Sequence, residues 1–338
     1  MKYKFNILVL AMVIIVCFCS IMSINKDQDL TSGSQYKEED YMLNLSYKND
    51  FKILQLGDIH LGIKDNIEEH LRFIDLTIKD ADPDLIIMNG DTFTYATKGI
   101  AKRLFEFMDS HNTPWTMTFG NHDEQCFFSI DWLTNYLNNY GNNCIFKDIQ
   151  DDNVFGNSNF VINLMDEDTI HDQIILMDSN RYNYKNPIGY DYLKPSQINW
   201  YINMVKYTTE NNGLTNSLVF MHIPVQEYEK AFNLASSDSS ILEYGESGEG
   251  VSASKTDSGF FNVVKELGST KAMFANHDHE NNYRVQYEGI YLCYGVNSTN
   301  RIYRNEDMMG GHLITIHEDH SLSFDHFYHK YNEVTLHD

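Results

Sequence analysis

Three short apolar runs in the first third of the chain each end in a cluster of polar residues. The runs lie at 53–56, 85–88 and 115–119. Runs of this length predict buried strands, and apolar residues at helical spacing after the first two predict helices at 66–80 and about 99–110. Alternating strands and helices indicate an α/β fold with parallel strands. The carboxyl ends of such strands gather at one edge of the sheet, where ligands bind.

The second half of the chain continues this theme with less regularity. Segment 236–258 is rich in Ser, Gly and Glu and has no apolar period, so it is interpreted as a long loop. The other predicted elements are strands at 160–164 and 173–177, a helix that opens at Pro195, a strand at 217–221, a helix at about 259–267, and strands at 271–275, 291–294, 313–316 and 322–327.

Composition narrows the classes of function. The chain has 338 residues, of which 42% are hydrophobic, enough for a packed core. Its formal net charge of −23 is spread along the chain and should repel nucleic acid, so no nucleic-acid binding is expected. A phosphorylated small molecule stays compatible with this charge, because a bound metal reverses the local field. Cys126, Cys144 and Cys293 are odd in number, so a Cys126–Cys144 disulfide and three free thiols are both open.

The N-terminus predicts the compartment. Lys2 and Lys4 precede an apolar run over 5–22, so residues 1–23 are interpreted as a signal peptide, with a signal anchor as the alternative. Either puts the body of the protein in the extracellular space or an endomembrane or lysosomal lumen. An uncleaved segment would make it a type II membrane protein, and no other membrane contact is expected.

The rest of the chain divides into three predicted parts. Residues 24–48 are a linker with a lead-in strand, residues 49–330 form the main domain, and residues 331–338 are a C-terminal tail. Sequons at Asn44 and Asn297 predict glycosylation in this compartment.

Five predicted strands end in carboxylate, amide or imidazole side chains. Any one of these is an ordinary turn residue, but their shared position at strand ends predicts a metal site. Asp91 can bridge two ions; Asp58, His60 and one late histidine can hold the first, and Asn121, His222 and the other late histidine the second. Mixed nitrogen and oxygen ligands suit two divalent or trivalent ions of Fe, Zn or Mn. The full set is Asp58, His60, Asp91, Asn121, His122, His222, His277 and His279.

Two such ions predict hydrolysis of a phosphate ester. They acidify a bridging water that attacks phosphorus, and they neutralise charge on the phosphoryl oxygens. His122 is left over beside Asn121, so it is predicted to be the catalytic residue that assists the leaving group. Asn121, His122 and His222 are expected to bind the substrate. The remaining C-terminal histidines lack a strand-end setting and are interpreted as non-ligands: His317, His320, His326, His329 and His337.

The ordered motifs resemble the signature of the calcineurin-like metallophosphoesterases over about 50–330. They are Gly57-Asp58-Ile59-His60, Gly90-Asp91, Gly120-Asn121-His122-Asp123-Glu124, His222 and His277-Asp278-His279. This resemblance implies a four-layer αββα sandwich of two mixed β-sheets flanked by helices. It also implies that Asp58, His60, Asp91 and His279 hold one metal, and that Asp91, Asn121, His222 and His277 hold the other.

Pro114-Trp115 and segments 190–197, 248–252 and 292–295 are similar to the plant and fungal purple-acid-phosphatase-like branch. True purple acid phosphatases lack the first-motif histidine, so His60 argues against a purple colour and an obligate Fe(III). The resemblance implies that the long loop is an ordered part near the site.

Asn276 stands where the family usually has glycine before the first histidine of the last motif. The site is expected to survive this change, because asparagine is the next most tolerant residue of positive φ.

The leading functional hypothesis is a metal-dependent phosphatase of phosphomonoesters. A phosphodiesterase that acts on nucleotides or phospholipid headgroups is the alternative within enzymes, because the same metals serve both reactions. A catalytically weak binding protein on the same scaffold is the alternative of another class. The oligomeric state stays open.

Overall fold

The computed structural model describes residues 36–141, 143–185, 188–238 and 240–335. The predicted signal peptide or anchor at 1–23 and most of the predicted linker lie outside these residues. Among the residues that are described, no helix has the length and apolar character needed to cross a membrane.

A five-stranded mixed sheet carries the first half of the site. Its strand order is β15–β14–β2–β3–β4. β2, β3 and β4 are parallel, as predicted, while β14 pairs antiparallel with both β2 and β15. The bounds are β2 (Phe51–Leu56), β3 (Leu85–Asn89), β4 (Trp115–Thr118), β14 (Gly310–Ile316) and β15 (Leu322–Tyr328).

An eight-stranded mixed sheet carries the second half. Its order is β1–β5–β6–β9–β11–β13–β12–β10, with β6, β9, β11 and β13 parallel. The bounds are β1 (Met42–Ser46), β5 (Phe160–Asp166), β6 (Thr169–Leu176), β9 (Asn216–Phe220), β10 (Leu242–Tyr244), β11 (Thr270–Ala275), β12 (Arg284–Tyr287) and β13 (Ile290–Tyr294). A separate hairpin pairs β7 (Tyr182–Asn183) with β8 (Gly189–Tyr190).

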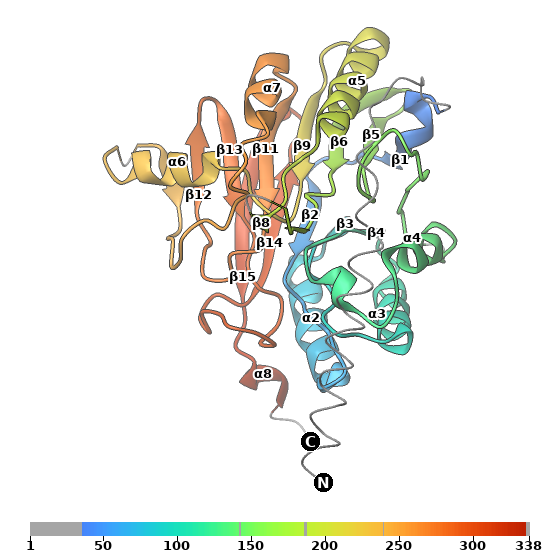
Figure 1. Cartoon of the computed structure of the whole chain (residues 1–338), viewed down its shortest axis with the longest axis vertical. Coiled ribbons are helices and arrows are strands. Elements are labelled where there is room, and N and C mark those ends of the chain that lie inside the picture. The colour runs from blue at the N-terminus through green and yellow to red at the C-terminus, as the bar shows by residue number, and fades with distance from the viewer. Residues whose placement is uncertain (1–35, 142, 186–187, 239, 336–338) are drawn as a thin grey trace.

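Helices cover the outer face of each sheet (Figure 1). On the five-stranded sheet they are α2 (Ile67–Ala81), α3 (Lys98–Ser110) and α4 (Ile130–Asn138). On the eight-stranded sheet they are α5 (Pro195–Asn212), α6 (Glu227–Ala235) and α7 (Phe260–Leu267). The short helix α8 (Asn332–Thr335) packs near α2, and two 3-10 turns, η1 (Glu38–Tyr41) and η2 (Asp123–Gln125), complete the described elements.

Alternation along the central strands produces four layers. In β5, Ile162 belongs to the core that β2 and β3 share, whereas its neighbour Val161 packs in the core with Trp200 of α5. Successive side chains of a strand point to opposite faces, so the eight-stranded sheet is buried on both sides. The predicted αββα sandwich with two mixed β-sheets is confirmed.

Several short elements were absent from the sequence prediction. Helices α4 and α6, strand β12 and the β7–β8 hairpin lie where no element was expected, and β10 lies inside the predicted loop. α4 carried a usable signal, because Ser129 accepts a hydrogen bond from the Trp132 amide as a helix N-cap. The two-residue and three-residue strands have too few side chains to show a period. Of the disulfide alternatives, three free thiols is the correct one.

Candidate metal centre

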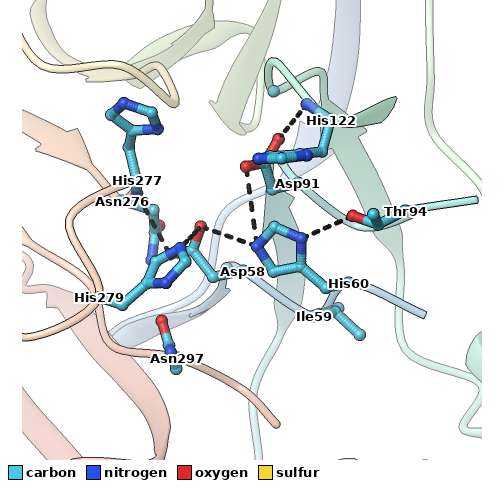
Figure 2. Close-up of polar contacts among 12 residues, drawn as sticks. Asp58, Ile59, His60, Asp91, Thr94, His122, Asn276, His277, His279 and Asn297 are labelled. Carbon is cyan, nitrogen blue, oxygen red and sulfur yellow. Dashed lines mark hydrogen bonds and ion pairs between the residues drawn. The ribbon is translucent and has the colours of Figure 1, made fainter. Parts of the chain in front are cut away.

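The carboxyl ends of five strands meet at one place between the two sheets. β2, β3 and β4 end just before Asp58, Asp91 and Asn121, and β9 and β11 end just before His222 and His277. Figure 2 shows side chains from both sheets facing one another there. The fold therefore brings together the residues that were selected for their position at strand ends.

Two groups of buried side chains result. The ligand atoms of Asp58, His60 and His279 all lie within 4.8 Å of one another, and so do those of Asp91, His222 and His277. Asp91 lies between the groups: its Oδ2 is 3.1 Å from Nε2 of His222 and 3.7 Å from Nε2 of His60. This is the position that a bridging carboxylate needs, and the two memberships match those implied by the resemblance. That these residues bind metal stays a prediction.

The residues present fit two metal ions. Buried polar atoms nearly always have a hydrogen-bond partner, and one without a partner costs about 1–3 kcal/mol. Bound ions would satisfy the partnerless atoms that gather here, which are nitrogen and oxygen ligands suited to Fe, Zn or Mn. These atoms are Asp58 Oδ1, His60 Nε2, Asn121 Oδ1 and His277 Nε2. Asp91 Oδ2 and His222 Nε2 form a close ion pair with each other and have no other hydrogen-bond partner.

Contacts at Nδ1 orient three of the imidazole rings so that Nε2 faces the centre. Nδ1 of His60 lies 2.7 Å from Thr94 Oγ1, and Nδ1 of His222 lies 3.0 Å from the backbone oxygen of Asn89. Nδ1 of His279 lies 3.1 Å from the backbone oxygen of Tyr303. The two backbone oxygens hold a proton on Nδ1 of His222 and His279, and the Thr94 hydroxyl can accept from Nδ1 of His60, so Nε2 of each ring is left as the ligand atom. The sequence did not reveal them, because none belongs to a motif.

Four residues of the candidate metal centre have a strained backbone conformation. Asp58, His60 and Asp91 have φ near +50°, and His277 has φ of +81°. Non-glycine residues rarely adopt these values, and they cluster at functional sites when surrounding structure holds them there.

Asparagine was expected to replace glycine at position 276 because it tolerates positive φ. That reason is wrong, because the residue with positive φ is its neighbour His277. Asn276 instead has a buried side chain whose Oδ1 accepts hydrogen bonds from Gln55 Nε2 at 2.7 Å and Asn89 Nδ2 at 3.0 Å. It therefore joins β2, β3 and the end of β11 beneath the site.

Burial and neighbouring charge set the protonation of the site. Burial alone would raise the pKa of Asp58, but the imidazoles of His279, His222 and His60 outweigh it and lower that pKa to about 2. Burial lowers the pKa of His60 and of His277 to about 3, so both imidazoles are neutral, as metal ligands must be. Burial also opposes charge on His222, but Asp91 outweighs it and raises that pKa to about 9. A metal bound there would displace this proton.

His122 lies at the edge of the centre and is half-buried. Its backbone N–H donates to Asp91 Oδ1 at 2.7 Å, and its Nδ1 lies 2.8 Å from Gln125 Oε1. Its ring centroid is 5.1 Å from that of His60. These contacts hold Nδ1 and leave Nε2 for a substrate.

Asn121 is oriented by a tyrosine from the β7–β8 hairpin. Asn121 Nδ2 donates to the Tyr182 hydroxyl at 3.0 Å, so its partnerless Oδ1 is the atom offered to a metal. Sequence reasoning missed Tyr182, which lies 61 positions away.

Replacing Tyr182 by phenylalanine is expected to weaken metal loading by about 10- to 100-fold, the usual effect of losing a partner of a metal ligand. The amide of Asn121 would lose the contact that sets its orientation. Metal titration of the purified protein measures this. Tyr207→Phe on α5, which removes a hydroxyl bonded to Glu39, is the matched control. Equal loading of the Tyr182 variant and wild type would contradict the role of Tyr182.

The two predicted glycosylation sites differ in exposure. Asn297 is 1% exposed, and its Nδ2 donates to the backbone oxygen of Tyr303 beside the metal centre. This burial does not favour a glycan at Asn297, and glycosylation there stays a prediction. Asn44 is exposed on β1, and glycosylation there stays a prediction.

A third group of His and Asp side chains lies at the opposite edge of the sheets. Nδ1 of His171 and of His320 lie 2.5 Å and 2.9 Å from the same oxygen of Asp172. These hydrogen bonds already satisfy the atoms that a metal would take, which agrees with the interpretation of His320 as a non-ligand.

The long loop packs on the segment that carries the late histidines. The Gly248 amide donates to the backbone oxygen of Glu280, and the Ser252 amide donates to the carboxylate of Asp278. The part of the loop at 248–252 is thus held beside the site, as the resemblance implied.

Comparison with known proteins agrees with this fold. The family model described as calcineurin-like phosphoesterase matches residues 51–252, more than half of the chain. The chain therefore belongs to the calcineurin-like phosphoesterase family, whose members bind two metal ions. Within that family its similarities place it in the purple-acid-phosphatase-like branch.

Three similar proteins illustrate the relationship. Probable inactive purple acid phosphatase 29 of Arabidopsis thaliana is 29% identical over 75% of this chain and 73% of its own length. Phosphatase DCR2 of Saccharomyces cerevisiae is 27% identical over 72% of this chain and 47% of its own. A dimetal phosphatase from Danio rerio shares the fold, with a TM-score of 0.56 and 12% identity over 80% of this chain and 94% of that chain.

Proposed function

We propose that this protein is a dinuclear metal-dependent phosphatase of phosphomonoesters. The observation that carries the proposal is the set of partnerless ligand atoms in two groups, with Asp91 between them and His122 at their edge. Two bound ions would supply an acidified water and neutralise charge on the phosphoryl oxygens.

The chain's own residues would position the substrate and supply the proton for the leaving oxygen. Asp91 offers Oδ2 to both groups while its Oδ1 holds the backbone N–H of His122. His122 is thereby fixed beside the phosphoryl position and can protonate the leaving oxygen. Asn121 and His222, which lie on the second group's side, would contact the phosphoryl group from there.

Replacing His122 by alanine is expected to lower kcat by about 10²- to 10⁴-fold, the usual contribution of general acid–base catalysis. Metal content should stay at the wild-type level, because His122 belongs to neither group. Steady-state kinetics and metal analysis on the same preparation measure both. Wild-type kcat in this variant would contradict the role of His122.

A panel of substrates tests the reaction class. Turnover of p-nitrophenyl phosphate should exceed that of bis-p-nitrophenyl phosphate, and metal content should approach two ions per chain. Preference for the diester would favour the phosphodiesterase alternative.

A catalytically weak binding protein is the other alternative, and names of relatives such as probable inactive purple acid phosphatase 29 make it worth testing. Less than one ion per chain, with no activity restored by added Mn or Zn, would favour it. The partnerless ligand atoms argue against it, because a binding scaffold gains nothing from that cost.

We also propose that the protein acts in the extracellular space or an endomembrane lumen, which the apolar N-terminal run supports.

A further inference from the structure

Three tyrosine rings border the candidate metal centre. The Tyr190 ring centroid lies 4.4 Å from that of His277, and the Tyr303 centroid lies 4.3 Å from that of His279. Tyr182 lies 5.3 Å from Tyr190 on the same hairpin. The two histidines belong to different ligand groups, so aromatic surface lies beside both groups.

Hydrogen bonds tie two of these hydroxyl groups back to the protein. The Tyr182 hydroxyl accepts from Asn121, and the Tyr303 hydroxyl donates to Glu249 Oε2 at 3.1 Å. Tyr303 is nevertheless 56% exposed. With the hydroxyls engaged, these residues offer ring surface rather than polar groups to a ligand. Exposed aromatic rings held in place in this way are typical of binding sites.

Tyr182 lies beside His122, on the leaving-group side of the site. The Tyr182 ring centroid is 6.5 Å from that of His122, with the two planes at 87°. A leaving group that receives its proton from His122 therefore departs next to Tyr182.

Charges near the tyrosines do not favour a second anionic group on the substrate. The three arginines within two positions of Tyr182 or Tyr303 each pair with a carboxylate, and Glu249 adds a negative charge of its own. The pairs are Arg181–Glu124, Arg301–Asp65 and Arg304–Glu306. A substrate with one phosphoryl group and an apolar body fits these surroundings.

We propose that Tyr182, Tyr190 and Tyr303 form a leaving-group subsite that selects phosphate monoesters of planar aromatic groups. The inference rests on the proposed function and assigns it a substrate class. In the reaction the ester P–O bond breaks, water supplies the oxygen of the new P–O bond, and the leaving oxygen takes its proton from His122. A planar ring packs edge-to-face or offset on tyrosine and gains affinity beyond its buried area, which a saturated ring of equal size does not.

Two phosphonates that resist hydrolysis separate aromatic from merely apolar recognition. Benzylphosphonate and cyclohexylmethylphosphonate would be titrated calorimetrically into the full-length protein saturated with Mn. Benzylphosphonate is expected to bind about 2- to 12-fold more tightly, the range that one aromatic pair contributes. Equal affinity, tighter binding of the saturated ring, or no binding of either compound would overturn the subsite.

Variants assign the preference to the tyrosines. Tyr190→Leu and Tyr303→Leu each keep an apolar side chain, and Tyr303→Leu also keeps the backbone oxygen that contacts His279. Each variant should lower the affinity ratio toward one. Tyr207→Leu on α5 should keep the wild-type ratio. A wild-type ratio in both site variants would overturn the assignment. These experiments measure binding, so their result does not depend on turnover. Aromatic preference without hydrolysis would contradict the proposed function and leave the subsite standing. Hydrolysis without aromatic preference would contradict the subsite and leave the proposed function standing.

Discussion

Replacing Asp91 by asparagine is expected to lower turnover of p-nitrophenyl phosphate by more than about 100-fold and to reduce the metal content. Loss of a residue that only supports a metal ligand lowers metal affinity or activity by about 10- to 100-fold. Asp91 lies where its carboxylate can serve both ligand groups at once, so its loss should have a larger effect. Asparagine preserves the size of the side chain but removes the charge. Kinetics with added Mn or Zn, together with metal analysis, measures the effect.

A second buried aspartate provides the control. Asp172 lies at the opposite edge of the sheets, bonded to His171 and His320, and Asp172→Asn should leave metal content and turnover unchanged. Near wild-type turnover in the Asp91 variant under metal-saturating conditions would rule out the dinuclear mechanism proposed above.

Replacing Gly57 by alanine is expected to destabilise the fold and disturb the site. A Cβ at this position would lie 2.1 Å from Cγ of Asn276, a distance that real Cβ atoms essentially never show. Overpacking costs about 1–3 kcal/mol, and this close approach predicts the upper end, about 3 kcal/mol. Gly57 directly precedes Asp58, so any backbone shift moves a predicted ligand. Urea unfolding and metal content measure the two effects, and Gly250→Ala, whose Cβ would meet nothing within 4 Å, is the matched control.

A double variant identifies the cause. Asn276→Gly alone removes the oxygen that accepts from Gln55 and Asn89, at a cost of about 1–3 kcal/mol. It also removes the atoms that clash with alanine at position 57. The double variant should therefore be less destabilised than the sum of the single variants by about 1–3 kcal/mol, within the range of contacting pairs. Additivity to within about 0.5 kcal/mol would show that Asn276 is not the obstacle.

The sequence predicted the ligand candidates because each follows a buried strand directly. A strand such as β3 is recognised from its own apolar residues. Asp91 comes just after β3 in the sequence, so it lies at the carboxyl end of that strand in any fold that contains the strand. The same local rule located β2, β4, β9 and β11. The four-layer architecture came from the resemblance, since periodicity alone predicts strands and helices but not which sheet each strand joins.

The residues that aim the ligands could not be predicted in this way. Thr94 and Gln125 reach His60 and His122 through loop geometry, and Tyr182 reaches Asn121 from a hairpin with two-residue strands. None of these contacts leaves a pattern in composition or spacing. The burial of Asn297 could not be predicted for the same reason: a sequon reports local sequence, whereas burial depends on tertiary packing.

Both ligand groups draw on two sheets that share no strand. The first group takes His279 from the eight-stranded sheet and the other two residues from the five-stranded sheet, and the second takes Asp91 from the five-stranded sheet and two histidines from the other. Under the proposed function, native folding and ion uptake would therefore be one linked equilibrium. An ion that binds only the folded chain adds about 2.7 kcal/mol of stability at 100 times its Kd, against a typical total of about 5–15 kcal/mol. If the two groups bind metal as proposed, the free metal concentration around the protein would set its stability against unfolding as well as its rate of catalysis.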